Sequence, residues 1–161
     1  MLNCLLVPLL ALAAAPAWTA PQDGDPVMPP DRGEVATTAS GLKYSVLQPA
    51  QGPSPKAGTK VTVHYSGWLT DGTLFDSSKK RGQPFTFVLG QGQVIKGWDE
   101  GVALMQKGSR YRFTIPPELA YGEIGAPPTI PASATLVFEV ELLDFLVMPE
   151  FRPADPEKQQ K

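Results

Sequence analysis

Apolar and polar residues alternate along three stretches of the chain, and this period of two is typical of β-strands that bury one face. The alternation covers residues 61–66, 110–115 and 136–142. A fourth, shorter apolar row occupies residues 85–89, and residues 42–47 form a further strand candidate after a Ser-Gly pair. Segments rich in glycine and proline separate these stretches, as expected for turns. The pattern therefore predicts a β-sheet.

A single segment has the spacing of an α-helix. Its four apolar residues are three, four and three positions apart, which places their side chains on one helix face. They are Ile95, Trp98, Val102 and Met105. Gly108 is expected to end the helix as its C-cap, and Gly97 and Gly101, which lack side chains, would let it lie close against a sheet. The expected fold class is α+β, an antiparallel sheet folded over one short helix.

The length of 161 residues leaves room for one domain with tails. Residues 41–146 contain all the strand and helix patterns and are expected to form that domain. Residues 18–40 are rich in proline and have no apolar periodicity, so we expect a flexible leader. Residues 147–161 are expected to form a polar tail.

The first 17 residues contain a long apolar run with no charged side chain. The run ends in Ala15-Pro16-Ala17, a small-x-small pattern typical of a signal-peptidase site, so residues 1–17 are expected to be a signal peptide. Cleavage after Ala17 is favoured over cleavage after Ala20, because the latter would put Trp18 three residues before the cut. The alternative is an uncleaved membrane anchor, against which the two prolines argue. We therefore expect an exported protein, periplasmic or secreted, that is tethered to a membrane only if the signal is not cleaved.

Charge and cysteine content exclude several classes of function. The formal net charge is -2 and no Lys/Arg-rich run occurs, so no nucleic-acid partner is expected. Cys4 is the only cysteine, so no intramolecular disulfide can form. It lies in the expected signal peptide and His64 is the only histidine, so no second histidine and no cysteine of the mature chain remain for a metal site or a Cys–His pair. Asp99 and Glu100 are adjacent on the predicted helix and diverge, so a solvated face is expected there. No metal or cofactor is implied.

Aromatic residues are the main candidates for chemistry. Trp98 lies on the predicted helix, and Tyr121 opens a Gly/Pro-rich loop, where a ring buried purely for packing is unusual. Phe87 suits a core position as well as a pocket. The rings of interest are Tyr65, Phe75, Phe85, Phe87, Trp98, Tyr121 and Phe138.

A series of short motifs runs through the predicted domain, from about Gly41 to Phe145. The motifs are 63–69 (VHYSGWL), 75–78 (FDSS), 84–90 (PFTFVLG), 94–101 (VIKGWDEG), 120–122 (AYG), 130–131 (IP) and 134–143 (ATLVFEVELL). In order and spacing they resemble those of the FKBP family of tacrolimus-binding prolyl isomerases.

The resemblance implies a half-barrel sheet wrapped over the helix, with a hydrophobic pocket between them. Trp98 would form the pocket floor, Asp76 and Tyr121 would place polar groups at its rim, and the Ile95 backbone N–H would bind a substrate carbonyl. By position, the residues assigned to catalysis are Phe75, Asp76, Trp98 and Tyr121. Those assigned to substrate binding are Tyr65, Phe85, Phe87, Gln93, Val94, Ile95, Ile130 and Phe138.

The chain departs from the usual family pattern at a few positions. Gln93 stands where Glu is common, but the resemblance implies a contact through the backbone carbonyl there. Ala126, Thr129 and Ala132 replace the frequent His, Ile and Pro of the loop over the pocket. These changes bear on peptide preference and drug affinity more than on activity.

The implied activity is peptidyl-prolyl cis/trans isomerisation, acting on proline-containing polypeptides in exported proteins. Desolvation and binding of a twisted imide would drive it, with Asp76 and Tyr121 orienting the rotating carbonyl. For Asp76 the alternative is an Asx-type turn with Ser77 and Ser78. Macrolides of the tacrolimus and rapamycin kind are a second ligand class.

Two rival functions use the same domain. One is a non-enzymatic binding module, against which retention of the polar rim argues, because a pure adaptor need not keep it. The other is a chaperone of unfolded chains, for which an inserted flap or a helical dimerisation arm would be expected. Tyr121 and Ile130 are too close for an insertion. A monomer without strong holdase activity is therefore expected.

Overall fold

The computed structural model describes residues 28–30 and 34–147, so the expected signal peptide, most of the leader and nearly all of the tail lie outside the described residues. The described chain forms seven β-strands, two short α-helices and one 3₁₀ turn. In chain order they are β1 (Val35–Thr37), β2 (Lys43–Gln48), β3 (Thr59–Leu69), β4 (Leu74–Ser77), α1 (Ser78–Arg81), β5 (Phe85–Val88), α2 (Lys96–Ala103), β6 (Arg110–Ile115), η1 (Pro117–Leu119) and β7 (Leu136–Val147).

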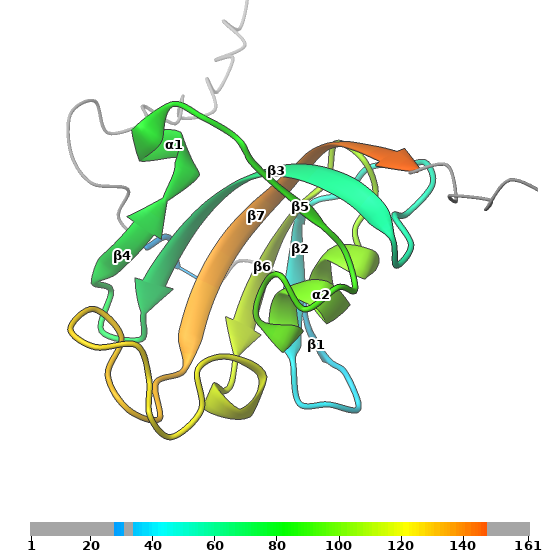
Figure 1. Ribbon diagram of the computed structural model, residues 1–161. Helices are drawn as coiled ribbons and strands as arrows, with labels where there is room; N and C mark the ends of the chain where they lie inside the picture. The colour runs from blue at the N-terminus through cyan, green and yellow to red at the C-terminus, as the bar shows by residue number, and fades with distance from the viewer. Residues whose placement is uncertain (1–27, 31–33, 148–161) are drawn as a thin grey trace, which may run out of the picture.

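All strands join one antiparallel sheet in the order β1-β2-β6-β7-β3-β4. β5 also pairs with β3, next to the part of β3 that pairs with β4. The sheet is curved and bends partly around α2, while β4 and α1 lie at the edge opposite β1 and β2 (Figure 1). The expected α+β class with an antiparallel sheet is confirmed.

The predicted alternation sets which face of each strand is buried. Tyr111 lies opposite Val140 and Phe113 opposite Phe138 in the β6–β7 pair, so the apolar rows of the two strands share one face. β6 has the predicted bounds, whereas β3 and β7 extend beyond the alternating residues. The shared apolar face and one face of α2 enclose the hydrophobic core.

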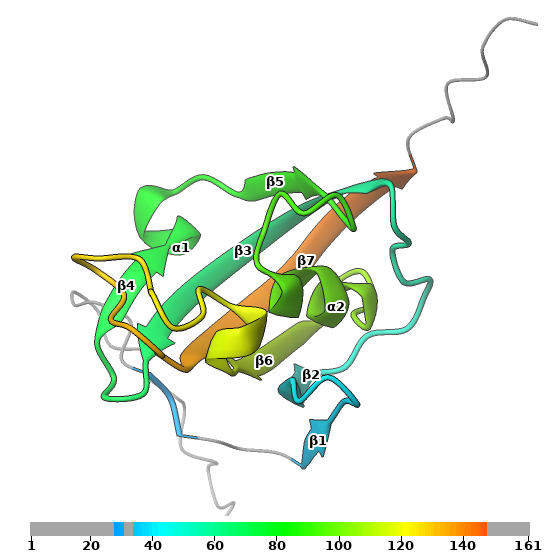
Figure 2. The ribbon, with the colours of Figure 1, turned by 60° about the horizontal axis from the view of Figure 1, so that its bottom comes forward.

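α2 lies against β6 because two of its glycines permit a close approach (Figure 2). A Cβ at Gly97 would come within 2.5 Å of the Ile115 side chain, and one at Gly101 within 2.8 Å of Phe113. A side chain at either position would force the helix or the contacted core side chain to move. The expected close contact of helix and sheet is thus present.

The helix is shorter than expected. It ends at Ala103 with Leu104 as C-cap, so the prediction that Gly108 caps it is wrong. The amide of Leu104 donates to Gly101 and that of Met105 to Val102, at 3.1 Å each, and such i→i−3 bonds tighten the last turn and end the helix. Gly108 instead bonds to the carbonyl of Leu142 at 2.7 Å.

Short elements appear where the sequence carries no periodic signal. β1 falls within the segment expected to be a flexible leader and pairs with β2. α1 is a second α-helix that the apolar spacing did not reveal. Further upstream, the carbonyl of Pro29 accepts a hydrogen bond from the Arg112 guanidinium. In the described part of the chain, no helix is long and apolar enough to cross a membrane.

Candidate functional site

A cavity of about 180 Å³ opens between α2, the β5–α2 connection, the β3–β4 region and the loop after η1. It is smaller than the roughly 300–1,000 Å³ of clefts that bind drug-sized ligands, so it suits a small ring and its immediate neighbours. Its lining is mainly aromatic and aliphatic, with a carboxylate, an amide and two phenolic hydroxyls as its polar groups. The lining residues are Tyr65, Phe75, Asp76, Phe85, Gln93, Val94, Ile95, Trp98, Tyr121 and Phe138.

Trp98 forms the bottom of the cavity and is 4% exposed. Its ring meets Tyr65 and Phe138 edge-on, with centroids 4.9 and 5.2 Å away. Edge-to-face pairs at these distances add to the stability gained from burial alone. Because α2 is pinned to β6 by its glycines, the Trp98 ring is held in place from behind by the core.

The walls depend on another close backbone approach. Phe75 packs edge-on against Phe138 with centroids 5.4 Å apart, and both rings lie over Gly67 of β3. A Cβ at Gly67 would fall 2.6 Å from Phe138 and 2.7 Å from Phe75. The glycine in the strand therefore makes the space that these two rings fill.

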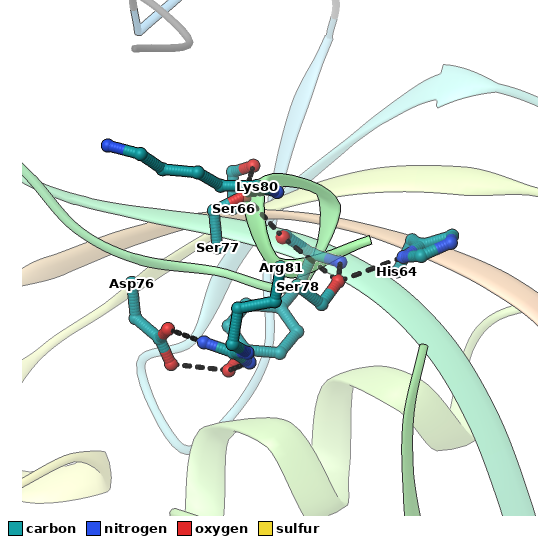
Figure 3. A network of polar contacts seen from close by, with 8 residues as sticks. His64, Ser66, Asp76, Ser77, Ser78, Lys80 and Arg81 are labelled. Carbon is teal, nitrogen blue, oxygen red and sulfur yellow. Dashed lines mark hydrogen bonds and ion pairs between the residues drawn. The ribbon is translucent and has the colours of Figure 1, made fainter. Parts of the chain in front are cut away.

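Polar groups meet at one side of the rim. Asp76 accepts hydrogen bonds from the Tyr65 hydroxyl and the Arg81 guanidinium, one on each carboxylate oxygen (Figure 3). Arg81 also donates to the Tyr65 hydroxyl at 2.9 Å and lies over its ring, 5.7 Å from the centroid. The three residues thus form a closed triangle of charge-assisted bonds.

The contacts of this triangle shift the pKa of Tyr65 and that of Arg81. Burial raises the pKa of Tyr65, and its hydrogen bond to Asp76 raises it further. The pKa of Arg81 is also raised, mainly by the hydrogen bond from Arg81 to Tyr65 and next by its hydrogen bond to Asp76. Tyr65 therefore stays a neutral donor, and Arg81 a cation, throughout the physiological range.

A second group of polar contacts lies beside the backbone of β3 at Tyr65. The Ser78 hydroxyl accepts from the Tyr65 amide at 2.8 Å and bonds to His64 Nδ1 at 3.0 Å, while Ser77 caps α1 by accepting from the Lys80 amide (Figure 3). The only histidine of the chain thus bonds to Ser78 beside β3. Asp76 points its carboxylate at Tyr65 and Arg81, which differs from the alternative of an Asx-type turn.

Ten of the twelve residues assigned from the sequence line the cavity, and Phe87 and Ile130 are not among its lining residues. Phe87 is 3% exposed, with its ring centroid 5.9 Å from that of Trp98, and packs in the core. Ile130 is 5% exposed and pairs with Ala126 within the loop. Both support the site from behind. Tyr121 is 44% exposed at the rim.

Arg81 is the residue that sequence reasoning missed. Its only signal is the short sequence Lys-Lys-Arg-Gly after Ser78, which is typical of an ordinary solvated turn. Its position depends on α1, whose Ser77 cap and left-handed Gly82 close a single turn. That turn returns the guanidinium to Asp76, five residues earlier.

Across residues 28–30 and 34–147, no group of three or more His, Cys, Asp or Glu side chains could hold a metal ion. What the site offers is a cavity lined mainly by aromatic and aliphatic side chains, with a neutral hydroxyl and an ion pair at its rim. Such a site can bind a ring and change the solvation of an attached polar bond.

Comparison with known proteins identifies the family. The family model described as FKBP-type peptidyl-prolyl cis-trans isomerase matches residues 52–143. "FK506-binding protein 1" of Dictyostelium discoideum is 56% identical over 105 residues, which are 65% of this chain and 98% of that protein. "FKBP-type peptidyl-prolyl cis-trans isomerase FkpA" of Aeromonas hydrophila is 58% identical over 109 residues, covering 68% of this chain but 40% of that protein.

Solved structures agree with this assignment. The crystal structure of FkpA from Escherichia coli superposes with a TM-score of 0.67 at 47% identity, covering 71% of this chain and 53% of that one. The crystal structure of AtFKBP13 gives 0.66 at 38% identity, covering 70% of this chain and 99% of that one. The similarity therefore extends over the whole of the smaller relative.

Proposed function

Because this chain belongs to the FKBP-type peptidyl-prolyl cis-trans isomerases and is an enzyme of that class, we propose that the cavity over Trp98 is where it rotates X–Pro bonds. The observation that carries the proposal is the combination of a buried indole floor with the Tyr65–Asp76–Arg81 triangle at one rim. The floor accommodates an apolar ring, and the rim faces the polar bond attached to it.

The reaction requires no nucleophile. Rotation about an X–Pro bond has a barrier of about 20 kcal/mol, which corresponds to roughly 0.01 per second without help. Resonance keeps the imide planar and places negative charge on its oxygen, and water stabilises that charge-separated form. A cavity that removes the water and binds the twisted form better lowers the barrier. Each 1.4 kcal/mol of such preference gives about a factor of ten in rate.

The residues have distinct roles in this proposal. Trp98 and the rings around it bind the proline ring, and the Ile95 amide binds a carbonyl of the substrate. Tyr121 and Asp76 orient the rotating carbonyl without transferring a proton. The raised pKa of Tyr65 supports a purely electrostatic role for the rim, because that hydroxyl does not ionise at neutral pH.

Substitutions at the floor and the rim test the site. Trp98→Leu removes the ring that the proline contacts, and Asp76→Val removes the acceptor that joins Tyr65 to Arg81. Each is expected to lower kcat/KM on a proline-containing peptide by roughly five- to thirtyfold, the effect of losing about 1–2 kcal/mol of transition-state preference. A protease-coupled isomerisation assay measures this.

The matched control is Asp71→Val, which removes an exposed carboxylate that bonds to the Thr73 amide in the β3–β4 turn. It should keep wild-type activity. Full activity in folded Trp98→Leu and Asp76→Val together would show that the cavity is not the reaction site.

We further propose that the substrates are exported proteins, in which slow X–Pro isomerisation limits folding. The apolar run before Ala17 and the small-x-small pattern support export, and cleavage there would leave a periplasmic or secreted enzyme. The intact mass of the protein recovered from the periplasm or medium tests this. A mass that starts at Met1, or recovery only from the cytoplasm, would contradict it.

A tacrolimus-type macrolide is the second proposed ligand of the cavity. The support is the aromatic and aliphatic lining of the site, and the printed name "FK506-binding protein 1" of the Dictyostelium relative. Tacrolimus is expected to inhibit the isomerase by competing with peptide for the cavity. Activity that saturating tacrolimus leaves unchanged would contradict the proposal.

The proposed assembly state is a monomer without strong holdase activity. The eight residues between Tyr121 and Ile130 leave no room for an inserted chaperone domain, which supports this proposal. Sedimentation that shows a stable dimer, or suppression of aggregation by an isomerase-inactive variant, would contradict it.

A further inference from the structure

The connection between β5 and α2, residues 89–95, supplies three lining residues of the cavity, Gln93, Val94 and Ile95. It includes two glycines with left-handed backbones, Gly90 at φ 73° and Gly92 at φ 65°. Glycine gains the most freedom on unfolding, so a short loop with two of them is held in one shape only by specific contacts. The binding surface therefore depends on what fixes this loop.

Backbone bonds hold the start of the connection. The Leu89 amide donates to Thr59 at 2.9 Å, and the Gly58 amide donates to Leu89 at 2.8 Å. Gly90 comes so close to the β2–β3 connection that a Cβ there would lie 2.8 Å from the Ala57 side chain. These contacts anchor one end, before the lining residues begin.

Asp99 holds the middle of the connection from the other side. It lies in the first turn of α2, immediately after Trp98, and is half-buried. Its Oδ1 accepts from the Gly90 amide at 2.9 Å and its Oδ2 from the Gly92 amide at 3.2 Å. Both oxygens of one carboxylate thus bind the loop, which corrects the expectation of a merely solvated face.

Chemistry and position make these contacts strong. Hydrogen bonds from amides to a carboxylate are roughly twice as strong as neutral ones. The negative charge also lies in the first turn of a helix, where the macrodipole favours it. Because α2 is fixed against β6 by Gly97 and Gly101, Asp99 couples the loop to the rigid floor of the cavity.

We propose that Asp99 is a positioning residue for the isomerase, which holds the wall of the cavity in its peptide-binding shape. The inference rests on the proposed function, because it takes the cavity over Trp98 as the site where peptide binds. Asp99 itself does not line the cavity. Asp99 contributes to binding. Without its hydrogen bonds the connection populates other conformations, and peptide affinity decreases in proportion to the fraction of molecules that remains competent to bind.

The test compares Asp99→Asn with Glu100→Gln. Asn has the size of Asp, but its NH₂ group cannot accept from the second loop amide and would face it donor to donor. Glu100 is the adjacent acid on the same helix and accepts from Ser40 instead, so its variant makes the same charge change away from the loop. Both variants retain the helix glycines and the core, and a thermal melt checks that each is folded.

Three readouts separate a positioning role from a general loss of stability. Asp99→Asn should raise the hydrogen-exchange rates of the Gly90 and Gly92 amides by roughly tenfold or more. It should weaken binding of a proline-containing peptide by roughly three- to tenfold and lower kcat/KM by the same factor, with kcat at saturation unchanged. Glu100→Gln should change none of these values.

Unchanged exchange at both amides, or faster exchange with wild-type peptide affinity, would overturn the inference. A fall in kcat with unchanged peptide affinity would overturn it as well. Failure of the underlying site is read separately: it would appear as full activity in Trp98→Leu, whatever Asp99→Asn does to the loop.

Discussion

Arg81 joins the rim of the cavity through contacts that only the folded chain creates. It donates to Asp76 and to the Tyr65 hydroxyl, and its guanidinium lies over the Tyr65 ring. The guanidinium is half-exposed, with a side-chain exposure of 51%, so the pair contributes little to global stability. Its contribution is to orientation, since the planar guanidinium can bind the Asp76 carboxylate and the Tyr65 hydroxyl at once.

Replacing Arg81 should therefore affect activity more than folding. Arg81→Ala is expected to lower kcat/KM by roughly three- to tenfold, because the Asp76 carboxylate loses one of its two fixed donors. The urea midpoint should stay close to that of the wild type. Lys79→Ala, on the same single-turn helix but paired with Glu141, is the matched control and should keep full activity. Equal losses in the two variants would contradict a specific role for Arg81.

The arginine also marks the limit of residue-level prediction. Asp76 and Tyr65 could be assigned because each lies in a family-like motif, but their partner lies in a turn whose sequence has no distinguishing feature. For Phe87 the sequence predicts a place in the site that the structure does not give it. Its ring lies two residues from Phe85 and shares that face of β5, and the sequence alone does not say which ring reaches the cavity.

Among the elements, α2 contributes most to the site because it carries Trp98 and Asp99 and makes its contact with β6 through glycines. Helix propensity and packing act in opposite directions at these glycines. Alanine would gain roughly 1 kcal/mol in an isolated helix. At Gly101, however, the added methyl would meet Phe113 at 2.8 Å.

Gly101→Ala is expected to destabilise the domain despite the better helix former. Overpacking of a filled core costs about 1–3 kcal/mol, which exceeds the gain in propensity. A helix pushed away from β6 would also shift Trp98, so peptide affinity should fall. Urea unfolding measures the first effect and a peptide titration the second. Lys96→Ala, at an exposed position of the same helix, should stay within about 0.5 kcal/mol of the wild type. A Gly101→Ala protein as stable as this control would be inconsistent with the tight contact.

The elements that could be predicted are those long enough to show a period. β6 and the alternating parts of β3 and β7 follow directly from their apolar rows, because one buried face imposes a period of two. β1 and α1 have three and four residues, which is too short for any period to appear. α1 is set instead by its ends, the Ser77 cap and the left-handed Gly82.

For the molecule as a whole, one face of the sheet packs on α2 and the cavity, and the other contacts the chain before β1. Side chains alternate along β6, so Tyr111 and Phe113 face α2 and the cavity side, while Arg112 between them points to the opposite face. Arg112 is nonetheless 3% exposed. It bonds to Glu139 at 2.8 Å and to the carbonyl of Pro29. The chain before β1 therefore touches the sheet on the face that does not hold the site.

Removing that contact should lower stability and leave catalysis unchanged. A chain that starts at residue 31 lacks the Pro29 carbonyl, whereas one that starts at residue 28 retains it. A hydrogen bond to a buried charged group contributes about 1.5–3 kcal/mol, so the free energy of unfolding of the shorter chain should be lower by roughly that amount and its urea midpoint should fall accordingly. Its kcat/KM should match that of the longer chain, because the cavity lies across the sheet from Arg112. Equal urea midpoints would show that the Pro29 contact contributes nothing. A loss of activity at equal stability would mean that the segment before β1 acts on the site, which the separation of the two faces does not allow.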